Sequence, residues 1–128
     1  MNQILTPGEI EFYESMSAYE LVDLIFTGVS AQVEILAIYI SILSAFFLVA
    51  YYFGNKLKSI ELFLFSSVYT LVCVIIFSGY YQTANSTAVM IYFSNGVNNT
   101  PATYISLGVM IIALVLSLSF MVKMSRSR

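Results

Sequence analysis

The hydrophobic positions of this chain fall into three long apolar runs that are separated by polar segments. The runs cover residues 31–53, 60–81 and 102–122, and none of them contains proline. Each run is long enough to cross a bilayer as a helix, which takes about 20 residues. The pattern therefore predicts an all-α integral membrane protein with three transmembrane helices.

The two connections between these runs differ in length and in expected structure. Residues 54–59, with the sequence GNKLKS, form a short polar hairpin, so the first two helices should be antiparallel neighbours. Residues 82–101 are uncharged and rich in Asn, Ser and Thr, which predicts a polar outer loop. Its apolar centre, residues 88–93, is too short to span a bilayer. This segment therefore either dips into the membrane interface or prolongs the second helix.

Residues 1–30 are predicted to form an acidic amphipathic helix outside the membrane. Thr6 suits the N-cap position, Pro7 suits the first turn, and Glu9 completes a capping box. The helix should then run from residue 7 to about residue 28. Its apolar side is made of Ile10, Tyr13, Leu21 and Leu24.

Composition supports a membrane protein and excludes several kinds of chemistry. The chain is 59% hydrophobic and 9% charged, whereas soluble domains carry roughly 25% charged residues. Its net charge of -2 gives no reason to expect nucleic acid as a partner. With no histidine and one cysteine, Cys73, the chain offers no histidine base, no typical zinc site and no internal disulfide. We find no catalytic, cofactor-binding or metal-binding motif, and expect a protein that is not an enzyme and needs no cofactor.

The basic residues predict how the chain is oriented in the membrane. Lys56 and Lys58 lie in the first connection, and the tail, residues 123–128, contains the remaining lysine and both arginines. With three spans, both places share one side of the membrane, which the positive-inside rule identifies as the cytoplasm. We therefore expect a protein of the inner or plasma membrane with its N-terminus outside and its C-terminus in the cytoplasm.

Small residues recur along one face of the first run. Ala37, Ser41 and Ala45 are four residues apart, a spacing that lets another helix approach closely. Glu34 shares this face and is therefore predicted to point at protein. It is either a proton or cation site at the mouth of a cavity, or an interfacial carboxylate that contacts hydroxyl groups and water. We favour the second interpretation, because Glu34 is only about one turn inside the run.

The other two runs also have a side suited to helix packing. The second run has a polar side made of Ser66, Thr70 and Cys73. The third run has a seam made of Ser106, Met110, Ala113 and Ser117. Hydroxyl groups on such sides bond to their own helix or join neighbouring helices. Glu61, at the start of the second run, is expected to pair with Lys58 three residues earlier.

The tyrosines are expected to divide into an interfacial group and a buried group. The interfacial ones are Tyr51 and Tyr52 on the inner side, and Tyr80, Tyr81 and Tyr104 on the outer side. Tyr39 and Tyr69 lie deeper in their runs, where their hydroxyl groups need a serine, a threonine or a backbone carbonyl as a partner.

Two classes of function fit these observations. The first is a structural, accessory or scaffold protein that packs through its small-residue faces against copies of itself or a larger membrane complex. The second is a homo-oligomeric channel or holin-like pore, lined by the polar side of the second run or by Glu34 and Ser41. We favour the first class, because hydroxyl stripes are common in helices that conduct nothing. In both cases the lipid bilayer surrounds the protein.

Overall fold

The computed structural model describes residues 5–96 and 100–127, and these residues are almost entirely helical. The helices are α1 (Pro7–Glu14), α2 (Ala18–Phe53), α3 (Ser59–Asn95) and α4 (Thr100–Arg126). The last three are long and apolar enough to cross a membrane. The structure therefore confirms the predicted all-α fold with three apolar helices.

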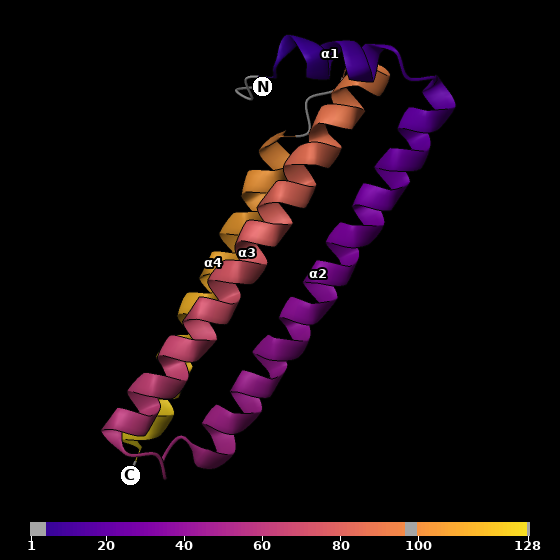
Figure 1. Ribbon diagram of the computed structural model, residues 1–128. Coiled ribbons are helices and arrows are strands. Elements are labelled where there is room, and N and C mark those ends of the chain that lie inside the picture. The colour runs from indigo at the N-terminus through magenta and orange to yellow at the C-terminus, as the bar shows by residue number, and fades with distance from the viewer. Residues whose placement is uncertain (1–4, 97–99, 128) are drawn as a thin grey trace.

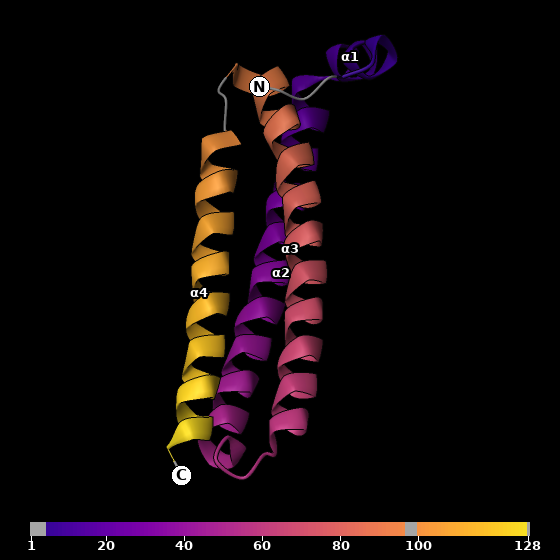
Figure 2. The same cartoon turned by 90° about the vertical axis from the view of Figure 1, so that its left-hand side faces the viewer.

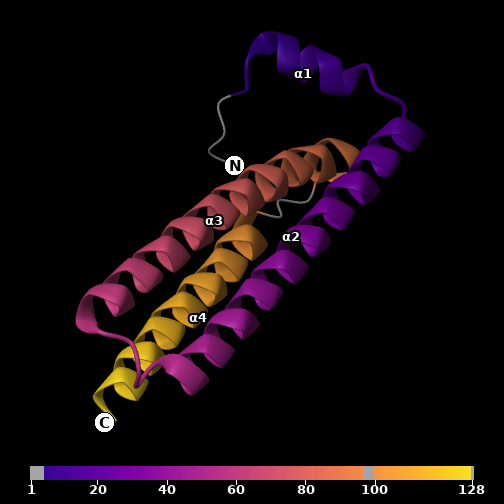
Figure 3. The same cartoon turned by 60° about the horizontal axis from the view of Figure 1, so that its bottom comes forward.

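The three long helices run side by side as a bundle, and α1 lies across one end of it (Figures 1 and 2). α4 is in contact with both α2 and α3, while the most extensive contact joins α2 to α3 (Figure 3). We call the end of the bundle that is covered by α1 the α1 end. The opposite end, where residues 54–58 connect α2 to α3, is the hairpin end. The C-terminus lies at the hairpin end (Figure 1).

The N-terminal helix is much shorter than predicted. The Thr6 capping box is present, because the Glu9 carboxylate accepts from the Thr6 backbone N–H at 2.8 Å. A second capping box follows, in which the Glu20 carboxylate accepts from the backbone N–H of Ser17 at 2.8 Å. This second box starts a new helix, since it satisfies amide groups that only a helix N-terminus leaves free. The predicted single helix from residue 7 to about 28 is therefore wrong, and residues 18–30 are the beginning of α2.

The predicted outer loop is also mostly helical. α3 continues through residues 82–95, so the alternative in which residues 88–93 prolong the second helix is the one the structure adopts. No glycine or proline interrupts the helix in this stretch. α3 ends where Gly96 takes a left-handed conformation with φ 72°, which glycine adopts at little cost. The assignment of residues 82–101 to a loop is thus wrong for most of its length.

α2 and α3 extend beyond α4 at the α1 end. α2 has 36 residues and α3 has 37, whereas α4 has 27. At about 1.5 Å per residue, these helices are about 54, 55 and 40 Å long. At the hairpin end α2 and α4 finish together, because a Cβ on Gly54 would lie only 3.1 Å from the Cβ of Met124. The extra length of α2 and α3 is therefore at the α1 end, as Figure 2 shows.

Two clusters of buried side chains hold the bundle together. The larger lies between the three long helices, where the ring of Phe46 stacks on Tyr69 with centroids 3.8 Å apart. The smaller lies at the α1 end, where Leu21, Thr87, Ala88 and Val89 are buried outside the larger cluster. α1 is attached there by the ring of Tyr13, which stacks on Phe93 at 5.2 Å. The α1 end thus has buried side chains of its own outside the larger cluster.

Candidate functional site: the outward face of α2

The small residues of the first run lie on the outside of the bundle. Ala37, Ser41 and Ala45, which we call the small-residue face, are all exposed. Glu34 is exposed as well, so the described part of this chain does not cover it, and the prediction that it points at protein now applies only to a partner. The reason is that α2 packs on its neighbours through its bulkier opposite side, which includes the buried Tyr39. Residues 5–96 and 100–127 thus leave the small-residue face exposed.

The hydroxyl groups on this face are already satisfied. Ser41 donates to the backbone carbonyl of Ala37 at 2.8 Å, and Ser44 donates to that of Ile40 at 2.8 Å. A serine bonded in this way presents little polarity to its surroundings. The face is therefore smooth and weakly polar, which suits the close approach of a second helix in lipid.

The polar side of α3 lies largely inside the bundle. Cys73 is completely buried, and Ser66 and Thr70 are half-buried. The Thr70 hydroxyl donates to the backbone carbonyl of Ser66 at 2.8 Å. These residues therefore face the interior of the bundle in part or completely. Among the small predicted site residues, those on the outward face of α2 are the exposed ones.

The seam of α4 faces the same interior and contains the partners of the two deep tyrosines. Ser117 is completely buried, and Ala113 packs against the larger cluster. Tyr69 and Ser117 hydroxyl groups lie 2.9 Å apart. The Tyr39 hydroxyl donates to the backbone carbonyl of Met110 at 2.7 Å. The structure thus confirms that each tyrosine finds a serine or a backbone carbonyl.

Glu61 contacts the residue that was predicted, but through a different group. Its carboxylate accepts from the backbone N–H of Lys58 at 2.9 Å. This contact caps the N-terminus of α3, whereas the sequence predicted a pair with the Lys58 ammonium group. The backbone bond is favoured because the first amide groups of a helix have no partner within it.

Two close contacts fix the height of Glu34 along the bundle. Tyr39 lies against Met110 of α4, and Gly54 lies against Met124. Because α2 and α4 are parallel, this register places Glu34 level with Tyr104. Glu34 thus lies close to the start of the apolar part of α4.

The antiparallel register of α2 and α3 gives a matching height. The ring of Tyr39 contacts that of Phe77 at 5.4 Å, and Gly28 lies against Thr87. Between these two contacts, each step forward along α2 is matched by a step backward along α3, and this register places Glu34 level with Tyr81. Glu34 is therefore at the height of two exposed tyrosines, since Tyr81 is 40% and Tyr104 58% exposed.

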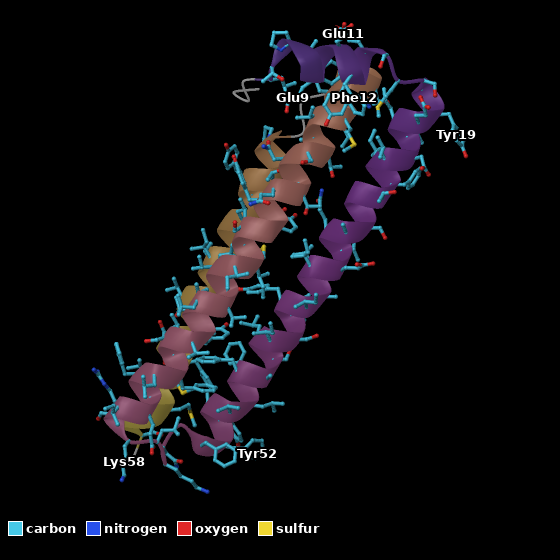
Figure 4. All side chains as sticks on the ribbon, in the orientation of Figure 1. Glu9, Glu11, Phe12, Tyr19, Tyr52 and Lys58 are labelled. Atoms are coloured by element: carbon cyan, nitrogen blue, oxygen red, sulfur yellow. The ribbon has the colours of Figure 1, made fainter. Side chains whose placement is uncertain are left out.

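Tyrosines also mark the hairpin end of the apolar region. Tyr51 and Tyr52 are exposed there, and the side chain of Tyr52 is labelled in Figure 4. The helix from Glu34 to Tyr52 is about 27 Å long at about 1.5 Å per residue. Tyr80 differs from its prediction, because it is 4% exposed and belongs to the larger cluster instead of the outer group.

Most of the charged residues are separated between the two ends of the bundle, although the acidic Glu61 lies at the hairpin end. The acidic residues of the α1 end are Glu9, Glu11, Glu14, Glu20 and Asp23. The basic residues described at the hairpin end are Lys56, Lys58, Lys123 and Arg126. Figure 4 shows this separation through its labelled Glu9 and Glu11 at one end and Lys58 at the other. The α1 end is thus strongly acidic.

An exposed apolar stripe, which was not predicted from the sequence, runs along the first part of α2. It consists of Tyr19, Val22, Phe26, Val29 and Val33, at alternating spacings of three and four residues. Tyr19 is 82% exposed and Phe26 71% exposed. Figure 4 shows Tyr19 directed away from the bundle. The spacing is visible in the sequence, but the helix predicted for residues 1–30 has a different apolar side.

A groove lies in the bend between α1 and α2. Its volume is about 430 Å³, and it is lined by Phe12, Ser15, Met16, Glu20, Asp23 and Leu24. The groove exists because α1 turns away from α2 at residues 15–17. The sequence contained one signal for it, the Ser17-x-x-Glu20 capping box, which marks a helix start at that position.

Comparison with known protein families, with curated proteins and with solved structures finds no match to this chain.

Proposed function

We propose that this protein is a small accessory or scaffold protein of a membrane, which binds a larger membrane complex through the outward face of α2. The observation behind this proposal is the exposure of Ala37, Ser41 and Ala45 on one side of the bundle. Helix association in lipid depends on close packing, which small residues permit. The other seams of small and polar residues pack within the chain, so this face is the one left for a partner.

The tyrosines support a position for the bilayer. Tyr81 and Tyr104 would mark one boundary of the hydrocarbon, and Tyr51 and Tyr52 the other, because tyrosine favours membrane–water interfaces. Their separation of about 27 Å agrees with a hydrocarbon thickness of about 30 Å. Glu34 then lies at the boundary within reach of water. This favours an interfacial carboxylate over a site that moves charge across the membrane.

The segregation of charge supports the orientation. All lysines and arginines of the chain lie in the hairpin or in the C-terminal tail. The positive-inside rule then assigns the hairpin end to the cytoplasm of an inner or plasma membrane, and the α1 end to the outside. Single cysteines at Ser15 and at Ser127, in a Cys73→Ala background, test this assignment. An impermeant maleimide should label intact cells at Ser15 and spare Ser127, and the reverse result would invert the orientation.

A homo-oligomeric pore is the alternative, and it is supported by Glu34 and Ser41 lying exposed on the same face. A ring of copies with this face inward would place both residues on a central path. The polar side of α3 fits a pore less well, because Cys73 is completely buried within the chain. The bonding of Ser41 to its own helix further weakens the pore interpretation, since that hydroxyl offers little to a passing ion.

One pair of substitutions tests the accessory role. Ser41→Leu fills the small-residue face, while Ser119→Leu makes the same change on α4, where Ser119 is also exposed and donates to its own helix at 2.8 Å. Both variants should fold normally, because neither side chain is buried. Complexes purified in mild detergent should lose their partner with Ser41→Leu and keep it with Ser119→Leu. Equal behaviour of the two would count against the face, and a ring of identical subunits would favour the pore.

A further inference from the structure

The apolar stripe of α2 reaches well beyond the proposed bilayer. Measured along α2 from Glu34 at about 1.5 Å per residue, Phe26 is about 12 Å and Tyr19 about 22 Å beyond the tyrosine boundary. The headgroup layer on one side of a bilayer is only roughly 5–8 Å deep. Lipid tails therefore do not cover these two side chains, although both are more than 70% exposed. An exposed aromatic stripe of this kind marks a protein interface.

The spacing of the stripe indicates that its partner is a helix. Apolar residues at alternating intervals of three and four form the seam along which two helices pack, with side chains fitting between those of the neighbour. The stripe also leads into the small-residue face, since Ala37 follows Val33 by one turn on the same side. One partner helix can therefore follow α2 from the membrane to the α1 end.

The charge beside the stripe indicates what kind of helix this is. Asp23 lies one turn from both Tyr19 and Phe26, and Glu20 lies next to Tyr19. A second copy of this chain with the same orientation would place its own acidic α1 end there, because its described basic residues are at the hairpin end. Like charges at an interface oppose binding, whereas opposite charges guide the partner and fix its register. A basic helix of another protein fits this surface, and a second copy does not.

The groove in the bend gives such a helix a place for one of its basic side chains. Glu20 and Asp23 line the groove together with Phe12 and Leu24. A lysine or arginine could lay its aliphatic stem on the apolar walls and bring its charge to the carboxylates. Asp23 borders the groove and lies one turn from Tyr19 and Phe26, so a long basic side chain of a helix on the stripe can reach past Asp23 into the groove.

We propose that the apolar stripe and the adjoining groove bind a basic amphipathic helix of a different membrane protein, and that this helix continues outward from a transmembrane segment packed on the small-residue face. The proposal rests on the accessory function proposed above and specifies the chemistry of the partner. It assigns Tyr19 and Phe26 as apolar anchors and Asp23 as the residue that selects for positive charge.

The test is photo-crosslinking in the membranes of the cells that make the protein. A benzophenone amino acid replaces Phe26 in the stripe, Ser41 in the small-residue face, or Ile112, which is 61% exposed on α4 and serves as the lipid-facing control. At Phe26 the crosslink should map by mass spectrometry to a helix of a different protein, adjacent to its transmembrane segment and with Lys or Arg beside its apolar positions. Asp23→Lys should lower the yield of this crosslink at least fivefold, while Glu11→Lys, the same charge change on α1, should leave it within twofold.

Any other crosslinking result would overturn the proposal, and each one would indicate a different role for the stripe. Crosslinks from Phe26 to a second copy would make the stripe a self-interface. Crosslinks only to lipid, or none to protein, would place the stripe in the membrane surface or in water. If Phe26 crosslinks to another protein and Asp23→Lys leaves the yield unchanged, the partner is not selected by positive charge, and the basic helix is wrong. If Ser41 crosslinks to a partner and Phe26 does not, the accessory function stands and this inference fails, whereas failure at both positions counts against both.

Discussion

The hydroxyl groups of Tyr69 on α3 and Ser117 on α4 lie 2.9 Å apart in the interior of the bundle. Ser117 also donates to the backbone carbonyl of Leu114 at 2.7 Å, which uses its one proton. Tyr69 is therefore the donor to Ser117. Because Tyr69 is 6% and Ser117 0% exposed, water cannot replace either partner easily. The contact links α3 to α4 with a defined direction.

This direction predicts that the two partners are unequal in their effect on stability. Ser117→Ala removes the hydroxyl acceptor of the buried Tyr69 side chain, leaves it at best a weaker thiol partner in Cys73, and should cost about 1–3 kcal/mol. Tyr69→Phe removes the donor itself and should cost about 0.6 kcal/mol, the average for such bonds in a membrane protein. The double variant should resemble Tyr69→Phe alone. Reversible unfolding in mixed micelles measures all three, and equal or additive losses would contradict the assigned direction.

A second prediction concerns the approach of α2 to α3 at Gly28. A Cβ added there would collide with the Oγ1 atom of Thr87, which is 2% exposed and donates to the Thr83 carbonyl at 2.9 Å. Gly28→Ala should therefore destabilise the α1 end by about 1–3 kcal/mol, as overpacking does elsewhere. Hydrogen exchange of residues 84–89 measures this local effect.

A matched control accompanies this prediction. Gly79 lies in α3 with no atom within 4 Å of an added Cβ, so Gly79→Ala should be neutral or slightly stabilising. Adding Thr87→Ala to Gly28→Ala should recover most of the lost protection, because it removes the colliding hydroxyl. Continued loss of protection in the double variant would show that glycine is needed at this position for another reason.

The cap of α3 gives a third prediction. Because the Glu61 carboxylate accepts from the backbone N–H of Lys58, the lysine side chain contributes little to the contact. Glu61→Ala should lower stability by about 1 kcal/mol, a usual value for the loss of a helix cap, whereas Lys58→Met should be nearly neutral. Thermal unfolding in detergent separates the two. Equal losses of stability in the two variants would instead support the predicted ion pair between the Glu61 and Lys58 side chains.

A fourth prediction concerns the pH dependence of α1. The pKa of Glu9 is lowered from its ordinary value by hydrogen bonds from the Thr6 backbone N–H and then from its hydroxyl. Because the folded pKa lies below the unfolded one, the cap stabilises α1 above the ordinary glutamate pKa, and this contribution is lost as the pH falls through the lowered value. The amide proton shift of Thr6, followed by NMR on acidification, should report the change. In Glu9→Gln that titration should disappear.

The sequence was sufficient for the architecture because membrane helices must satisfy their backbone internally, so long apolar runs have few other solutions. It was also sufficient for the partners of Tyr39 and Tyr69, because a buried hydroxyl needs an acceptor or donor wherever it lies. Both arguments depend on local chemistry alone. They hold without knowledge of how the helices are arranged.

The predictions that failed concern how helices are arranged relative to one another. Local sequence patterns do not determine that arrangement. The face of α2 with Ala37 and Ser41 resembles a packing seam, but within the chain the bulkier side with Tyr39 and Phe46 offers more contact area. Small residues in lipid therefore indicate a possible contact without saying which helix makes it. The break before Ser17 was detectable from its capping box, but the apolar spacing from Tyr13 to Leu24 favoured one continuous helix.

The last prediction concerns Glu34, whose height beside Tyr81 and Tyr104 places it at the proposed membrane boundary. On the accessory interpretation its carboxylate is solvated there and moves no charge, because it is exposed and lies away from the middle of the span. Glu34→Gln should then fold and assemble as the wild type does, since it keeps the size and hydrogen bonding of the side chain. Glu34→Leu should still insert, but it should alter assembly, because it extends the apolar surface past the boundary and lets α2 shift outward. Proton or cation flux in liposomes that contain the purified protein should be negligible and unchanged in both variants. A clear wild-type flux that Glu34→Gln abolishes would instead establish the pore, because only the charge differs between those two proteins.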